Sequence, residues 1–277
     1  MGKGKGMDIR IFAPHWGSNE LAPALFIERV VQAGFDGVEM ALPLDPALRR
    51  EWCARIADAG LGLIAQQWET ALEPQFEAHR AALAALLENA CAARPLLVNS
   101  HTGKDYYTAR QNRELIALAA RIGRAHGVPV LHEIHRSRFS GHPALLLPYL
   151  EHDPDLELTA DLSHWCCACE SLLEDQPHTL ELTLPRVRHI HARVGHEQGP
   201  QVADFRAPQA RAALERHLAW WDRIVALRRA AGAAQLTLTP EFGPVPYTPT
   251  LPYSGQPLSN AWELNVAMLR LLRERYA

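Results

Sequence analysis

The strongest constraint on the fold is a regular alternation of short apolar segments and longer helical segments along the chain. Eight segments rich in apolar or β-branched residues are separated by stretches in which apolar residues recur at helical spacing. The predicted strands cover residues 8–13, 37–42, 62–68, 95–101, 128–135, 156–163, 187–194 and 235–242. Such alternation is typical of parallel strands joined by right-handed helical crossovers.

Eight strand–helix units in 277 residues predict an α/β fold, a (β/α)8 TIM barrel with one domain spanning residues 1–277. A doubly wound open sheet is the alternative. The segment APHWGSN after the first strand, however, lacks the glycine-rich phosphate turn of that fold. Residues 1–7 are expected to be a flexible leader, with Met7 as the expected natural start. No apolar signal core precedes the first strand, so export is not expected.

The composition argues against several classes of partner. The net charge of −3 gives no electrostatic basis for binding nucleic acid or an anionic membrane. No apolar run reaches the roughly 18 residues of a membrane helix. Five cysteines without a disulfide pattern indicate a reducing compartment, so we expect a cytoplasmic protein. The CxxC of Cys166 and Cys169 is interpreted as small buried residues near the start of a helix.

Four polar residues stand at the ends of four successive predicted strands. They are Glu133, Asp161, His191 and Glu241. The C-terminal ends of barrel strands face one mouth, so these side chains are expected to converge there. Three carboxylates and one imidazole suit Mn²⁺, Mg²⁺, Co²⁺ or Zn²⁺ better than a metal that prefers thiolates. The sequence therefore predicts one divalent-metal site.

Histidines and an arginine near these four residues are candidate substrate contacts. The alternation of side chains along a strand places His135 on the same face as Glu133 and His132 on the opposite face. His189, His191 and Arg193 share one face in the same way, with Arg193 nearer the mouth. The predicted substrate-binding residues are His101, His135, His164 and Arg193, and weaker candidates are His15, Trp16, Glu39, Gln67, Trp68 and Lys104.

These residues resemble those of the xylose isomerase-like TIM-barrel superfamily, and the resemblance covers essentially the whole chain. It rests on Glu133, on the DLSH motif of Asp161 and His164, on His191 in HIH, and on Glu241 before Phe242 and Gly243. The superfamily includes sugar isomerases, ketose 3-epimerases of the tagatose epimerase type, hydroxypyruvate isomerases, inosose dehydratases and endonuclease IV-type enzymes. The segment HIHARVGHEQGPQV also resembles a bacterial group labelled sugar phosphate isomerase/epimerase.

The resemblance implies a metal-dependent isomerase or epimerase of a keto-sugar or related polyol. It implies a divalent ion, often Mn²⁺, held by all four residues, with Glu133 and Glu241 also serving as the acid and base. A proton α to the carbonyl would be removed to give an enediolate. The same enolisation could instead begin the dehydration of a keto-inositol. The resemblance also implies that the chain could form a homodimer.

The sequence departs from the ketose epimerases at one position. Those enzymes carry an arginine six residues after the metal histidine, where this chain has Glu197. Two other functions stay open. An endonuclease IV-type phosphodiesterase is disfavoured because no Asp-x-His pair follows the seventh strand and the chain has no basic surplus. A non-catalytic sugar-binding barrel is disfavoured by the intact set of metal-ligand types.

Overall fold

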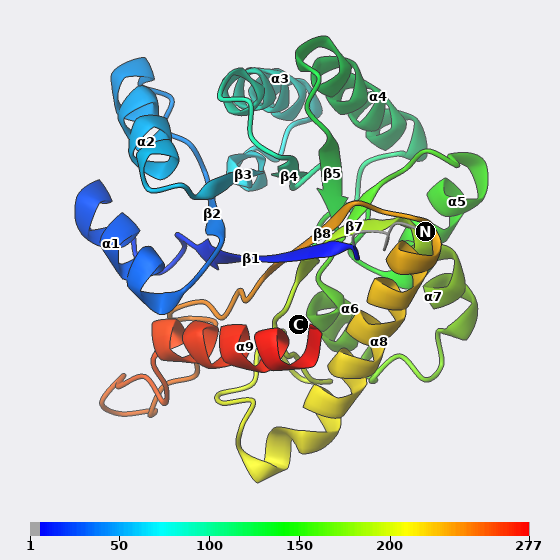
Figure 1. The fold of residues 1–277 in the computed structure, drawn as a ribbon. Coiled ribbons are helices and arrows are strands. Elements are labelled where there is room, and N and C mark those ends of the chain that lie inside the picture. Colours follow the sequence, from blue (N-terminus) through cyan, green and yellow to red (C-terminus); the bar gives the residue numbers. More distant parts are fainter. Residues whose placement is uncertain (1–5, 277) are drawn as a thin grey trace, which may run out of the picture.

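Eight parallel strands form a closed barrel in which each strand pairs with its neighbours in sequence order and β8 pairs with β1. The computed structural model describes residues 6–276. Helices surround the barrel (Figure 1) and α9, drawn in red, packs against β1. The predicted (β/α)8 barrel is therefore confirmed. The leader predicted over residues 1–7 falls mainly on residues 1–5, which lie outside the described residues.

The strands occupy the predicted places but are mostly shorter than predicted. They are β1 (Asp8–Pro14), β2 (Gly37–Met40), β3 (Gly62–Gln67), β4 (Val98–Ser100), β5 (Val130–Glu133), β6 (Leu158–Ala160), β7 (Val187–His191) and β8 (Gln235–Thr239). The prediction that the sixth strand continues to Ser163 is wrong. β6 ends at Ala160, because the side chain of Asp161 caps a helix that begins at the next residue and accepts a hydrogen bond from the Ser163 backbone amide.

Helices connect consecutive strands on the outside of the barrel. They are α1 (Pro23–Ala33), α2 (Pro46–Asp58), α3 (Phe76–Ala92), α4 (Ala109–His126), α5 (Pro143–His152), α6 (Leu162–Cys169), α7 (Pro177–Thr183), α8 (Arg211–Ala230) and α9 (Ala261–Tyr276), with short 3-10 turns η1 (Glu69–Leu72), η2 (Leu184–Arg186) and η3 (Pro208–Ala210). Several begin with proline, whose fixed φ suits the first helical turn. The sequence predicted one weak helix between β6 and β7, where the structure has α6 and α7.

Part of the lower interior of the barrel is an apolar layer. Phe12, Ile64 and Leu131 on β1, β3 and β5, and Leu97 just before β4, pack as one cluster. Gly37 leaves room for the ring of Phe12, since a Cβ there would lie 2.3 Å from a ring carbon. Three polar residues lie two positions further along the same strand faces, toward the C-terminal mouth: Gln66, Asn99 and Glu133.

The cysteine pair lies on α6, where Cys166 is buried and Cys169 is half-buried. Burial raises the pKa of the Cys169 thiol to about 11. No group of side chains among residues 6–276 that could hold a metal includes a cysteine. The interpretation as packing residues therefore holds for Cys166, whereas Cys169 is half-buried and is the last residue of α6 rather than near a helix start. Within the same residues, no helix is both long and apolar enough to span a membrane.

We expect Phe12→Ala to lower the free energy of unfolding by about 3–5 kcal/mol, because it opens a cavity in the fully buried lower layer. Tyr253→Ala is the control. Its side chain is exposed, and removing it should change stability by less than about 0.5 kcal/mol. Urea unfolding followed by circular dichroism measures both changes. Equal stability of the two variants would contradict this account of the barrel interior.

Candidate metal centre

The four predicted ligands converge at the C-terminal mouth of the barrel. Glu133 and His191 are the last residues of β5 and β7, Asp161 follows β6, and Glu241 lies two residues beyond β8. One oxygen or nitrogen atom from each lies within 4.8 Å of the corresponding atoms of the other three. All four residues are buried. The strand ends therefore bring together side chains that are more than 100 residues apart in sequence.

His191 presents a free ring nitrogen to this group. Its Nε2 lies 3.0 Å from Oε1 of Glu39 on β2. Its Nδ1 lies 2.9 Å from Glu241 Oε2 and 3.6 Å from Glu133 Oε1, yet makes no hydrogen bond. Histidine ligands of metals commonly use one ring nitrogen for the metal and the other for a carboxylate. Nδ1 of His191 is therefore the nitrogen donor of the group.

Negative charge dominates the centre. Burial opposes a charge on His191, but Glu241, Glu39 and Glu133 hold its pKa well above the ordinary value. Burial raises the pKa of Asp161 to about 6, although the charge of Arg193 opposes that shift. An imidazolium thus balances part of the carboxylate charge, and a bound divalent ion would take over this role on displacing the proton.

Arg193 supplies the permanent positive charge beside the centre. Its Nη2 contacts Asp161 directly and lies 3.7 Å from Glu241 Oε2. Its guanidinium carbon lies 4.8 Å from the ring centroid of Tyr247 and 5.9 Å from that of Trp16. The structure places Arg193 above His191 and nearer the mouth, as the alternation predicted.

Three histidines form a row from β4 to α6. Nε2 of His101 lies 2.9 Å from Glu133 Oε2. The rings of His101 and His135 are 4.4 Å apart, and those of His135 and His164 are 3.9 Å apart. Burial lowers the pKa of both His135 and His164 well below the ordinary value, so both are neutral. His164 is fully buried with Nε2 2.8 Å from Arg193 Nη2, which places it behind the site.

Two further groups overlap with the four-residue group. Glu133 forms one with His101 and His135, and His191 forms another with Glu39 and His189. In the group of Glu39, His189 and His191, Nε2 of each histidine lies 3.0 Å from the Glu39 carboxylate. Hydrogen bonding therefore accounts for the short distances in this group. The four-residue group offers three carboxylates and an unpartnered nitrogen. This donor set fits Mn²⁺, Mg²⁺, Co²⁺ or Zn²⁺.

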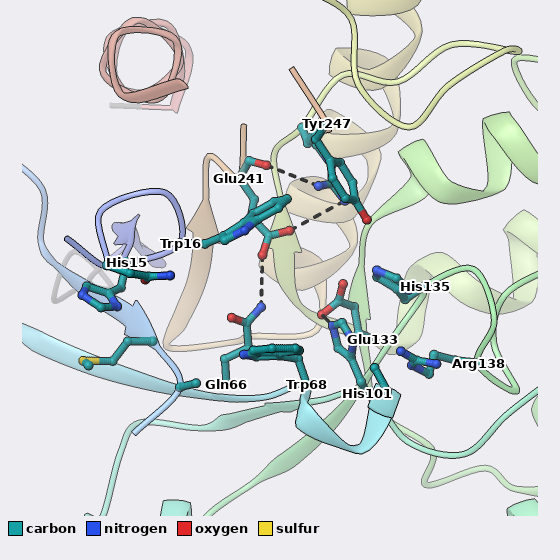
Figure 2. Close-up of a pocket in the computed structure, with 15 residues that line it drawn as sticks. His15, Trp16, Gln66, Trp68, His101, Glu133, His135, Arg138, Glu241 and Tyr247 are labelled. Carbon is teal, nitrogen blue, oxygen red and sulfur yellow. Dashed lines mark hydrogen bonds and ion pairs between the residues drawn. The ribbon is translucent and has the colours of Figure 1, made fainter. Parts of the chain in front are cut away.

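A cavity of about 410 Å³ lies above the centre. Its walls carry the aromatic side chains of Trp16, Trp68 and Tyr247, and Figure 2 shows Glu133 and Glu241 near the centre of the cavity, with Glu241 above Glu133 in the view. His101, His135 and Arg193 also line it, whereas the lining does not include His164 among the described residues. An apolar cavity with a few convergent polar groups is typical of a small-molecule site.

Sequence reasoning missed the roles of several interior residues. Glu39 was a weak candidate for substrate contact, but its buried carboxylate instead holds His189 and His191. Asn99 on β4 donates to Glu133 Oε2 at 2.5 Å. Both residues reach the barrel axis from strands for which the sequence indicated no ligand.

The glutamine on β3 that faces the cavity was also misassigned. The expected contact was Gln67, but its side chain is buried against Thr70 and Ser100. Gln66 faces inward and donates to Glu241 Oε1 at 3.0 Å. The signal was present, because Gln66 shares a strand face with inward-pointing Ile64.

Solved structures of the same fold match almost the whole chain. A probable 3-DHS dehydratase, AsbF, from Bacillus anthracis matches at a TM-score of 0.62 and 14% identity over 95% of this chain and 99% of that chain. A xylose isomerase-like TIM barrel protein from Mycobacterium smegmatis, in complex with magnesium, matches at a TM-score of 0.60 and 14% identity. The match covers 97% of this chain and 98% of that chain. The 3-keto-D-glucoside 4-epimerase YcjR from E. coli matches at a TM-score of 0.57 and 14% identity, over 96% of this chain and 100% of that chain.

The same barrel is also found in an enzyme of a different class. Endonuclease IV from Thermus thermophilus matches at a TM-score of 0.56 and 19% identity over 96% of this chain and 99% of that chain. No protein-family model matches this chain, and no curated protein sequence is significantly similar to it. The chain therefore shares its (β/α)8 barrel fold with xylose isomerase-like TIM-barrel proteins, but identities of 14% to 19% do not show that it catalyses the same reactions.

We expect one divalent ion to bind per chain and His191→Ala to abolish binding, because the variant removes the only nitrogen donor of the group. Glu39→Gln should weaken affinity by roughly 10- to 100-fold, since it loosens the carboxylate that orients His191. Elemental analysis and calorimetric titration with Mn²⁺ measure both effects. The control His126→Ala removes a histidine on α4 outside all three groups. A stoichiometry of two, or unchanged binding by His191→Ala, would contradict this assignment.

Proposed function

We propose that this protein is a divalent-metal-dependent isomerase or epimerase of a keto-sugar or related polyol. The observation that carries the proposal is the convergence of Glu133, Asp161, Glu241 and Nδ1 of His191 beneath one aromatic-walled cavity. The similarity to a keto-sugar epimerase and to a magnesium-containing barrel supports it. We propose Mn²⁺ as the ion, with Mg²⁺, Co²⁺ and Zn²⁺ as alternatives.

A bound divalent ion would polarise a substrate carbonyl and stabilise the negative charge that develops as the α proton leaves. Glu133 and Glu241 are the two carboxylates of the group that form part of the cavity wall. They are therefore assigned the removal and return of the proton. Return to the same carbon from the other face gives epimerisation, and return to the neighbouring carbon gives isomerisation.

The surrounding residues hold the two glutamates in place. Asn99 and His101 both contact Oε2 of Glu133, which leaves Oε1 for the centre of the site. Gln66 contacts Oε1 of Glu241 on the other side. These contacts fix the carboxylates before substrate arrives, which lowers the entropic cost of reaching a reactive geometry.

Dehydration of a keto-inositol or similar compound is the second candidate. It begins with the same proton removal and needs a group that protonates the departing hydroxyl. His101 lines the cavity with Nε2 2.9 Å from Glu133 Oε2 and is placed for such a role. The similarity to a probable dehydratase agrees with this candidate. The product distinguishes the two reactions, since dehydration lowers the mass by one water.

We expect Glu133→Gln and Glu241→Gln each to lower metal-dependent proton–deuterium exchange by about 100-fold or more, because each removes an acid–base group. The measurement is NMR of a panel of ketoses and keto-inositols incubated with enzyme in D₂O. Glu215→Gln, an exposed change on α8, is the control and should keep full activity. Metal-bound protein that hydrolyses phosphodiesters and exchanges no α proton would contradict the proposal. Near-full activity in either glutamine variant would remove that residue as a base.

A further inference from the structure

One wall of the cavity carries a buried arginine that the proposed chemistry does not use. Arg138 lies in the turn between β5 and α5 and lines the cavity together with His101 and His135. Only 4% of its surface is exposed. Figure 2 shows its side chain on the same side of the cavity as these two histidines and Glu133.

The turn that carries Arg138 is tightly fixed to the metal-ligand strand. The Arg138 amide donates to His135 O at 3.1 Å, and the Gly141 amide donates to Arg138 O at 2.9 Å. Ser140 Oγ donates to the carbonyl of Glu133, which ties the far end of the turn to β5. A Cβ at Gly141 would lie 2.9 Å from His135 O, so the turn requires glycine there. The position of Arg138 relative to Glu133 is therefore built into the fold.

The Arg138 guanidinium has unused hydrogen-bonding capacity. Its recorded side-chain bond runs from Nη1 to the carbonyl of the adjacent Ser137 at 2.9 Å, and its Nε has no partner. No carboxylate of residues 6–276 lies within 4.0 Å of it, in contrast to Arg193, which pairs with Asp161. A guanidinium offers five donors, and burying it without a partner is costly. Because the fold nevertheless keeps this charge in a cavity wall, we expect Arg138 to have a function there.

A second cation reinforces the positive character of this end of the cavity. Lys104 is 5% exposed, and its Nζ donates to the carbonyl of the cavity residue Ala71 at 2.7 Å. Its backbone is held by Asn112 through two hydrogen bonds. Burial lowers the pKa of Lys104, and the charge of nearby Arg138 lowers it further. Arg138 therefore places positive charge in the cavity wall on the side of His101, His135 and Glu133, with Lys104 held at the neighbouring cavity residue Ala71.

We propose that Arg138 binds an oxyanion group of the substrate, a carboxylate or a phosphate, so that the substrate is an anionic sugar derivative. The identification of the ligand as substrate rests on the proposed function, whereas anion binding at Arg138 does not. A guanidinium matches the planar pair of oxygens of a carboxylate and also two oxygens of a phosphate. With the anion at Arg138, the remainder of the molecule extends across the cavity toward Glu133 and Glu241.

The test is calorimetric binding of gluconate, glucose 6-phosphate and sorbitol to metal-free protein, which separates the two anionic groups from a neutral control. We expect at least one anion to bind more tightly than sorbitol. Arg138→Met should weaken that binding on the order of 10-fold or more, and Arg138→Lys should restore part of it. Arg110→Met, with the same charge change at an exposed position on α4, should bind as wild type. Equal binding of the three compounds by wild type, or unchanged anion binding by Arg138→Met, would overturn the proposal.

Thermal unfolding of the same variants separates ligand binding from a structural role. Removing a buried charge that has no acidic partner should leave the melting temperature of Arg138→Met unchanged or raise it. A clear fall in melting temperature together with unchanged anion affinity would show a structural arginine and overturn the proposal. The two proposals fail separately. If the protein binds anions but exchanges no α proton, only the proposed enzyme function is contradicted. If it turns over neutral ketoses and has no affinity for anions, only the proposed anion binding at Arg138 is contradicted.

Discussion

The site depends on the placement of four carboxylates inside one barrel mouth. Glu39, Glu133, Asp161 and Glu241 are all at most 5% exposed. Among the described residues, Arg193 is the one arginine or lysine within ion-pair distance of any of them, and histidines form the other ion-pair contacts. Burying like charges this close together is strongly unfavourable unless positive charge compensates them. A bound divalent cation would compensate this charge, and the protonated His191 balances part of it in the chain without metal.

The barrel can hold this concentration of buried charge because its apolar and polar residues lie in separate layers. Inward-facing residues alternate along each strand, so the buried apolar layer of Phe12, Ile64, Leu97 and Leu131 can lie directly below polar residues on the same strand faces. The lower layer contributes stability, and the strand ends above it contribute the candidate site. This division explains how the four candidate ligands come from strands five to eight without disturbing the core. The cavity above them carries both acidic and basic side chains in its wall.

Much of this could be predicted from the sequence, because the relevant signals are local. Strand–helix alternation predicted the barrel, and the position of a polar residue at each strand end predicted that Glu133, Asp161, His191 and Glu241 would meet. The boundary of β6 was wrong because Asp161 serves two purposes, as a candidate ligand and as the cap of α6. No local sequence pattern identifies an acidic residue that is both a candidate metal ligand and a helix cap.

Other features depend on contacts across the barrel that no local pattern records. Glu39 meets His191 although 152 residues separate them, and only closure of the sheet brings β2 opposite β7. Arg138 stands in a turn, where side-chain direction follows from the turn's own hydrogen bonds rather than from a strand period. The sequence could name candidate ligand types at strand ends, but not the residues that orient them or the buried Arg138 in the cavity wall.

The most direct test of the central claim is a crystal structure of protein soaked with Mn²⁺, with anomalous data collected near the manganese absorption edge. The account predicts one anomalous peak coordinated by Glu133, Asp161, Glu241 and Nδ1 of His191, with Nε2 of His191 still on Glu39. A peak held instead by His101, Glu133 and His135, or no peak at the barrel mouth, would contradict it.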